Sequence, residues 1–261
     1  MTSIPAAWTR ELADRFGGGF DPASPALRTI GREAEFPVVN SQGWIGDVQL
    51  LLQEVAQQNP AMKAKYEGPL LVELKSPRFI LAAEVGVGTV ELITGPRDDL
   101  RSLESDHLQG LSCLLQAAEA TEQRVLGTGI QPRSPASPEI MCPKPRYQVL
   151  LQTMGPSWLW FTLTASDQVH VDIGLDELGE ATNCCSLLTA ATVALCGNSS
   201  VFHDQNAKVC SSREHLMGQI LSGDFRHGMP SGPIAGLEDL IGQLVGHRHL
   251  MAKNEGSPLP G

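Results

Sequence analysis

Several features that mark common classes of protein are missing from this sequence of 261 residues. No apolar run approaches the about 20 residues that a helix needs to cross a bilayer. The segment from Met1 to Arg15 contains Glu11 and Asp14 and lacks the apolar core of a secretory signal. We therefore expect a cytoplasmic protein that has no membrane partner.

Basic residues are scarce relative to acidic ones. The chain has 19 Lys and Arg against 29 Asp and Glu, which gives a net charge of −10. Nonspecific binding to nucleic acid or to an anionic membrane requires a basic surface. The charge balance therefore argues against nucleic acid as a partner.

Cysteine pairs with the spacing of a metal site and the familiar nucleotide motifs are also missing. None of the six cysteines forms a Cys-x-x-Cys pair, so a zinc site has little support, and we expect reduced, mostly buried thiols. There is no Gly-x-x-x-x-Gly-Lys-Ser/Thr loop and no Gly-x-Gly-x-x-Gly turn. These absences argue against a P-loop or Rossmann nucleotide site.

The sequence does contain carboxylates inside apolar segments of strand type. In the first, residues 30–39, Glu33 and Glu35 are two apart and therefore share one face of a strand, while Ala34 and Phe36 face the other way. Two buried anions at this spacing repel, and a hard divalent cation such as Mg²⁺ relieves the repulsion. The alternative is a solvated strand face, where Glu-x-Glu pairs are common.

The second acidic segment, residues 83–96, contains Glu84 and Glu91 on either side of Gly86 and Gly88. A spacing of seven places the two carboxylates on opposite faces of a regular strand. Glycine in a strand often marks a bulge or a close backbone approach. We therefore expect one bulge to return both carboxylates to the same side.

The remaining patterns alternate between helix and strand periodicity. Helical spacing covers residues 5–16, 50–58, 97–124, 146–154, 176–194 and 234–245; strand signals cover residues 70–73, 79–84, 90–93, 125–131 and 163–172. The end, residues 256–261, has the composition of a loose tail. This order predicts an α+β fold with a largely antiparallel sheet flanked by helices.

Several other polar residues are candidates for binding. Gln168, His170 and Asp172 share one face of their predicted strand, where the imidazole suits a metal or a phosphate. The alternative for His170 is a core histidine whose ring nitrogens are hydrogen-bonded within the protein. Arg213 is suited to forked phosphate recognition, with an ordinary surface arginine as the alternative.

Two cations follow a proline-rich loop. Lys144 and Arg146, in the run Cys-Pro-Lys-Pro-Arg-Tyr, are placed to clamp an anion, and a solvated basic turn explains them equally well.

Six short motifs of the sequence, most of them described above, occur in the order found in the glutamate–cysteine ligase family. The chain resembles this family from about Thr9 to Leu221. The similarity is to the plant and bacterial branch, whose fold is related to glutamine synthetase. The matching segments are residues 30–35, 83–96, 127–132, 143–147, 168–172 and 198–213.

The resemblance implies an enzyme that uses ATP and Mg²⁺ to join the γ-carboxylate of glutamate to the amine of cysteine, as in glutathione biosynthesis. It implies that Glu33, Glu35, Glu84 and Glu91 hold Mg²⁺ or contact the amino acid. It further implies that Gln168, His170, Lys144 and Arg146 bind substrate or nucleotide, and that Arg213 binds phosphate and acts in catalysis. Metal ions and an arginine would together neutralise charge during phosphoryl transfer.

Two alternatives remain. Carboxylates that bind the metal do not encode the substrate, so a carboxylate–amine ligase for another acid or amine is the first. Family members carry a further C-terminal portion, so residues 1–261 are expected to form a single ligase-like domain that is incomplete at its C-terminus. That expectation favours weak glutamate-dependent ATP hydrolysis, or an inactive homologue with a binding role.

Overall fold

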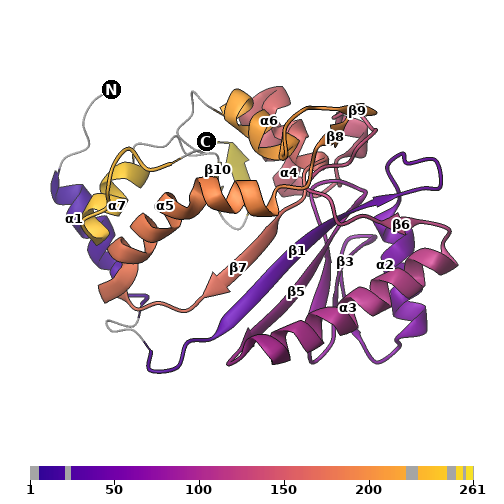
Figure 1. Cartoon of the computed structure of the whole chain (residues 1–261), viewed down its shortest axis with the longest axis horizontal. Coiled ribbons are helices and arrows are strands. Elements are labelled where there is room, and N and C mark those ends of the chain that lie inside the picture. Colours follow the sequence, from indigo (N-terminus) through magenta and orange to yellow (C-terminus); the bar gives the residue numbers. More distant parts are fainter. Residues whose placement is uncertain (1–5, 21–24, 222–228, 246–250, 255–256, 261) are drawn as a thin grey trace. The chain divides into compact units, whose positions relative to one another are not determined.

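The computed structural model describes residues 6–20, 25–221, 229–245, 251–254 and 257–260. Its central feature is a seven-stranded sheet in the order β2-β3-β4-β5-β1-β6, with β7 also paired to β1. The pairings along this order are antiparallel. Figure 1 shows these strands with helices beside them. The predicted α+β class is confirmed.

The helices are α1 (Ala6–Gly17), α2 (Val48–Gln58), α3 (Leu100–Ala120), α4 (Pro145–Met154), α5 (Leu178–Cys196), α6 (Ser212–Leu221) and α7 (Leu237–Leu244). The sheet strands are β1 (Ile30–Val39), β2 (Lys63–Glu67), β3 (Leu70–Lys75), β4 (Phe79–Ala83), β5 (Thr89–Arg97), β6 (Arg124–Val125) and β7 (Asp167–Val171). Two separate hairpins join β8 (Val201–Phe202) to β9 (Gln205–Asn206) and β10 (Met251–Asn254) to β11 (Ser257–Pro260). Short 3-10 helices are η1 (Pro138–Ile140), η2 (Gly155–Thr162) and η3 (Leu175–Glu177).

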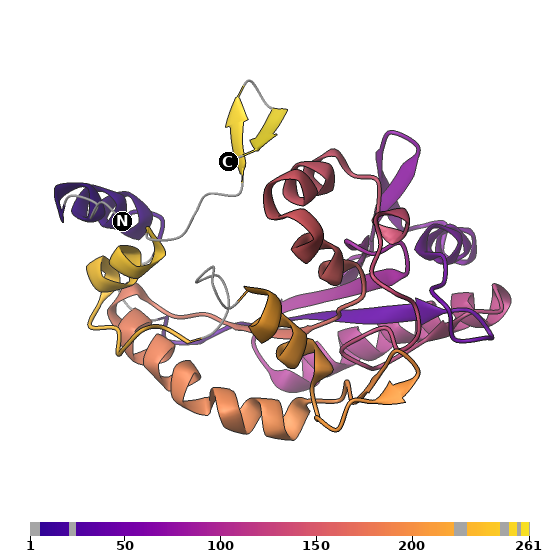
Figure 2. The ribbon, with the colours of Figure 1, turned by 90° about the horizontal axis from the view of Figure 1, so that it is seen from above.

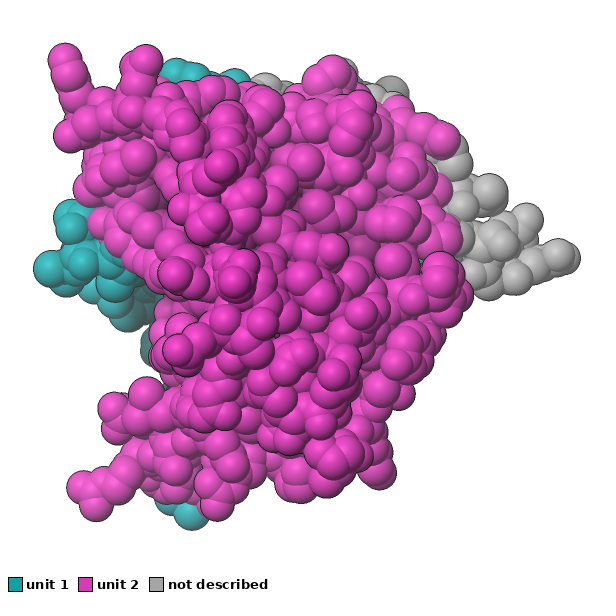
Figure 3. Space-filling view, turned by 90° about the vertical axis from the view of Figure 1, so that its right-hand side faces the viewer, with its two compact units in different colours: residues 1–28, 171–196, 216–249 teal, residues 29–170, 197–215, 250–261 magenta. Residues whose placement is uncertain are grey.

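Contacts divide the chain into two compact units, coloured separately in Figure 3. Unit 1 contains residues 1–28, 171–196 and 216–249, and unit 2 contains residues 29–170, 197–215 and 250–261. Within unit 1, α1 and α7 are joined by the Arg10–Glu238 ion pair at 3.3 Å. Except for Val171 at the end of β7, the sheet belongs to unit 2, as do the residues predicted for the site apart from Asp172, which lies in unit 1.

The core of unit 2 lies between the sheet and helices α2 and α3. Leu51 of α2 and Leu114 of α3 are fully buried with Leu81 and Leu92 of the sheet. Figure 2 shows α3 running along the sheet on one side. Because side chains alternate along a strand, this packing leaves the opposite face of the sheet for other residues.

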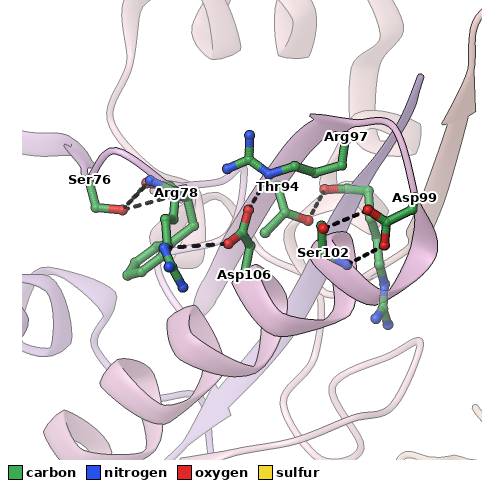
Figure 4. A network of polar contacts seen from close by, with 9 residues as sticks. Ser76, Arg78, Thr94, Arg97, Asp99, Ser102 and Asp106 are labelled. Carbon is green, nitrogen blue, oxygen red and sulfur yellow. Dashed lines mark hydrogen bonds and ion pairs between the residues drawn. The ribbon is translucent and has the colours of Figure 1, made fainter. Parts of the chain in front are cut away.

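The start of α3 is fixed by capping and by ion pairs (Figure 4). The Asp99 side chain caps the helix by accepting a hydrogen bond from the Ser102 amide at 2.8 Å. One turn later, Asp106 is buried, and its carboxylate accepts from Arg97 Nε at 2.6 Å. Arg78 Nε lies 3.8 Å from the same carboxylate. The helix is thereby joined to β5 and to the turn before β4.

Four expectations about elements were wrong in extent. The helix expected at 97–124 begins at Leu100 and ends at Ala120, because Asp99 caps it. The strand expected at 125–131 is reduced to β6. The strand expected at 163–172 is reduced to β7, because residues 163–165 pair with residues 129–131 instead of continuing the strand. The expected tail contains β11.

The thiols also differ from expectation. Most of the six cysteines were expected to be buried, but only Cys142 is buried, and four are exposed: Cys184, Cys185, Cys196 and Cys210. Three of the exposed thiols lie on α5, which has no buried residue despite its apolar composition. The apolar composition of residues 178–196 predicted that their side chains are buried, and this prediction was wrong.

Among the described residues, no helix combines the length and the apolar character that crossing a membrane requires.

Candidate active site

Strand β1 presents Glu33 and Glu35 on the sheet face opposite α2 and α3. Ala34 is buried, and Phe36 packs against the helix-side core, so the alternating glutamates point the other way. In the register of β1 with β5, Glu35 lies directly across from Glu91. The period-two argument therefore placed the first two carboxylates correctly.

The second acidic segment is a hairpin, so the expected single strand with a bulge is wrong. Strand β4 ends at Ala83, which pairs with Val90 of β5, and the chain turns between them. The Glu84 amide donates to the Thr89 carbonyl at 3.1 Å, which closes the turn. Glu84 and Glu91 therefore approach each other from two neighbouring strands.

Both glycines of this turn are required by close packing. A Cβ on Gly86 would lie 2.1 Å from the Thr162 carbonyl oxygen, and one on Gly88 would lie 2.3 Å from Ile45 Cγ1. Neither distance is possible for a real side chain. The expected close backbone approach at these glycines is confirmed, although no bulge is involved.

The hairpin and β1 together assemble a carboxylate triad from Glu35, Glu84 and Glu91. One oxygen from each of the three side chains lies within 4.8 Å of the others. All three are partly or largely withdrawn from solvent, and Glu91 is only 8% exposed. Oxygen donors in this arrangement suit a hard divalent cation, so the residues present fit a Mg²⁺ site.

The triad is electrostatically strained in the absence of a cation. Burial is the largest cause that raises the pKa of Glu91 to about 8, followed by the charges of Glu84, Glu33 and Glu35 and a hydrogen bond with Glu84. Burial and the Glu84 charge also raise the pKa of Glu35. The triad therefore retains a proton at neutral pH unless another positive charge replaces it.

Glu35 has two partners that oppose this shift. Ser166, just before β7, donates to Glu35 Oε2 from its amide at 2.6 Å and from its hydroxyl at 3.1 Å. The charge of Arg213 also lowers the Glu35 pKa. These contacts hold one carboxylate of the triad in place and favour its ionised form.

Strand β7 brings His170 to the same face of the sheet. His170 Nε2 lies 3.5 Å from Glu33 Oε2, and its side chain is 55% exposed, so it is not a core histidine. Gln168, two residues earlier on β7, shares this face by alternation and is also exposed. On the other face, Arg32 of β1 forms a two-pronged ion pair with Asp167 at 2.9 and 2.5 Å.

Arg213 lies at the start of α6, where its amide donates to Ser199 Oγ at 3.3 Å. Its guanidinium is about one-third exposed and pairs with Glu214. The charge of Arg213 lowers the pKa of Glu35, which is the interaction that links this residue to the triad.

Lys144 and Arg146 are placed differently from each other. Lys144 is buried, and its ammonium donates to the Ala83 carbonyl at 2.7 Å. Arg146 is exposed, lies 4.8 Å over the Tyr147 ring and donates to the Tyr147 hydroxyl at 2.9 Å. Its charge interacts with that of Glu84. Thus Arg146 is available to an anion beside the triad, whereas the Lys144 ammonium is bound to the backbone.

Sequence reasoning missed Ser166 and the Arg32–Asp167 pair. Ser166 contacts a residue 131 positions away, and Asp167 contacts one 135 positions away. No local spacing distinguishes either from its neighbours. Their roles follow only from the pairing of β7 with β1.

Comparison with known proteins supports the reading of these motifs. A comparison with curated proteins gives no match. The family model described as glutamate-cysteine ligase family 2 matches residues 29–241, which include β1, the hairpin, β7 and the start of α6. The chain therefore belongs to glutamate-cysteine ligase family 2.

Proposed function

We propose that this protein is an ATP- and Mg²⁺-dependent ligase that joins the γ-carboxylate of glutamate to the amine of cysteine. The observation that carries the proposal is the convergence of Glu35, Glu84 and Glu91 on one sheet face in a chain of this family. The product, γ-glutamylcysteine, is the intermediate of glutathione biosynthesis that the family resemblance implies.

The reaction has two steps. A γ-carboxylate oxygen of glutamate attacks the terminal phosphorus of ATP, and ADP leaves. The cysteine amine then attacks the acyl carbon of the γ-glutamyl phosphate; inorganic phosphate leaves, and the nitrogen loses a proton as the amide forms. The enzyme thus has to hold three anionic groups together: the triphosphate, the substrate carboxylate and its own triad.

The residues of unit 2 divide this task. Glu35, Glu84 and Glu91 would hold Mg²⁺, and Glu33 with His170 extends the acidic face beside them. Bound Mg²⁺ would neutralise the charge on phosphate oxygens during transfer. Arg213 would bind phosphate as a fixed cation, Arg146 would bind a substrate carboxylate or phosphate, and Gln168 would contact substrate from β7.

A coupled assay tests the proposal. The protein is supplied with MgATP, glutamate and cysteine, and both ADP and γ-glutamylcysteine are measured. We expect ADP release that depends on glutamate and dipeptide that depends on cysteine. Dipeptide from another acid or amine would replace the substrate assignment, and neither ADP nor dipeptide from any pair would contradict a ligase function. MgATP binding by calorimetry separates an inactive homologue from an enzyme tested with the wrong substrates.

A further inference from the structure

The segment that precedes α4 packs along the turn that carries Glu84. The Cys142 amide donates to the Val85 carbonyl at 2.7 Å, and the Val87 amide donates to the Ile140 carbonyl at 2.9 Å. Gly86 and Met141 also form a bridge between the two segments. The shape of the acidic turn therefore depends on residues about 55 positions later in the chain.

Lys144 acts on one peptide group of this turn. Its ammonium donates to the Ala83 carbonyl at 2.7 Å, and the amide of the same peptide group, which belongs to Glu84, donates to Thr89. Both ends of the peptide that leads into Glu84 are therefore held. Because this peptide plane sets the direction of the Glu84 side chain, it also sets where that carboxylate meets Glu35 and Glu91.

The burial of Lys144 needs a reason. The residue is 6% exposed, and its Nζ lies 5.4 Å over the Tyr147 ring. Burying an ammonium is costly unless its contacts compensate, and an apolar residue would fill the space at lower cost. A cation is nevertheless used here, bound to the backbone carbonyl that leads into the triad carboxylate of Glu84.

We propose that Lys144 is a positioning residue of the Glu35–Glu84–Glu91 triad, which holds the Ala83–Glu84 peptide so that Glu84 completes the site. This inference rests on the proposed function, because it assumes that the triad binds a divalent cation. It assigns Lys144 a different role from the nucleotide or substrate contact expected from sequence.

Lys144 could influence the triad either by positioning Glu84 or only by its positive charge, and these two roles predict opposite changes in metal affinity when the residue is replaced. Removing a cation near an acidic site strengthens the binding of a divalent ion if charge alone matters, because one repulsion is lost. Removing a positioning contact weakens binding, because the ligands no longer converge. The direction of the change therefore separates the two roles.

The experiment titrates the full chain with Mn²⁺ and follows free Mn²⁺ by electron paramagnetic resonance. We expect Lys144→Met to weaken binding by about tenfold, the range found when an outer partner of a metal ligand is removed. Lys144→Arg, which retains a charged donor, should restore much of the loss. Unchanged or tighter binding by Lys144→Met overturns the positioning role.

A matched control removes a side-chain contact to the backbone elsewhere in the sheet. Gln49 of α2 donates to the Leu71 carbonyl at 3.0 Å and accepts from the Leu71 amide at 2.9 Å, on the helix side. Gln49→Met should therefore leave Mn²⁺ affinity unchanged even if it lowers stability. If Lys144→Met is too unstable to titrate, Lys144→Gln takes its place with the same criterion.

The parent protein distinguishes failure of this inference from failure of the proposed function. If the parent binds no Mn²⁺, the triad is not a cation site and the proposed function loses its basis. If the parent binds Mn²⁺ and Lys144→Met binds it equally well, only the positioning role is overturned.

Discussion

At the scale of single residues, the carboxylates of unit 2 fall into distinct environments. Glu35 accepts two hydrogen bonds from Ser166 and feels the charge of Arg213. For Glu91, by contrast, every cause that shifts the pKa raises it, and none lowers it. Glu33 contacts His170 at the edge of this acidic face. Neighbouring glutamates therefore differ in how strongly burial and nearby charges oppose their ionised forms.

The first prediction concerns Glu35. Glu35→Gln retains the shape of the side chain but removes one ligand charge from the triad, so Mn²⁺ or Mg²⁺ affinity should drop by more than about tenfold, or about 1.4 kcal/mol. The double variant Glu33→Gln with Glu35→Gln should lose metal-dependent nucleotide binding by at least as much. Calorimetric titration of each folded variant measures the effect.

Glu73→Gln provides the control for that titration. Glu73 lies on β3 and pairs with Lys65 at 3.9 Å, outside the triad. Its substitution removes the same charge from the same sheet and should change metal affinity by less than about threefold, because the interaction is more distant and screened. Equal losses in the Glu35 and Glu73 variants would mean that net charge, rather than coordination, governs binding.

At the scale of elements, local periodicity predicted those structures whose cause is local. The alternation of Ala34 and Phe36 with Glu33 and Glu35 defines β1 and its two faces within a few residues. The triad could be predicted only in part, because the Glu84 turn is shaped by Thr162 and Ile45, which pack against Gly86 and Gly88. These partners are distant in sequence, so a bulge and a hairpin were indistinguishable from spacing alone.

The same reasoning applies to the backbone contact of Lys144 and to the shortening of the strand expected at 163–172. A lysine in a proline-rich loop has the composition of a solvated turn or an anion clamp, and only the Ala83 carbonyl, 61 positions away, shows where its ammonium binds. Residues 163–165 pair with residues 129–131, including a bridge between Thr164 and Ile130, and β7 begins only at Asp167. Long-range contacts therefore decided both outcomes.

The second prediction concerns the anchoring of α3. Asp106→Asn removes the charge that Arg97 and Arg78 share and leaves the partly buried Arg97 without its ionic partner (Figure 4). We expect unfolding in urea to become easier by about 2 kcal/mol, in the range for breaking a partly buried charge-assisted contact. Metal affinity should not change, because Asp106 packs on the helix side of the sheet.

The exposed Arg15–Glu11 pair on α1 provides the comparison. Both side chains are mostly solvated, so Glu11→Gln should alter the free energy of unfolding by less than about 0.5 kcal/mol. If the two substitutions have equal effects, Asp106 does not anchor α3.

At the scale of the whole molecule, the site depends on long-range pairing within unit 2. Glu35, Glu84 and Glu91 come from β1 and the β4–β5 hairpin, Ser166 lies just before β7, and Arg213 lies on α6. The convergence of Glu35, Glu84 and Glu91 destabilises the sheet, because three partly buried carboxylates with the same charge lie close together. Stability of the metal-free chain and the function proposed for the triad are therefore in opposition.

The third prediction expresses this opposition as a dependence on pH. In the metal-free protein the pKa of Glu91 rises from 4.5 to about 8, so the folded state holds a proton that the unfolded chain releases above pH 4.5. The stabilisation from that proton is complete below pH 4.5 and is lost as the pH rises through about 8. Urea unfolding in the presence of a chelator should therefore show stability falling between these values, by an amount on the order of a few kcal/mol.

The variant Glu91→Gln isolates this effect from other titrating groups. A neutral amide needs no proton, so the variant should match the parent near pH 5 and be more stable than the metal-free parent near pH 8.5. Added Mg²⁺ should reverse that order at pH 8.5, because it binds the folded parent and replaces the lost proton. A parent whose stability relative to Glu91→Gln is constant from pH 5 to pH 8.5 would show that the triad is not under charge repulsion. The cation would then have no carboxylate strain to relieve.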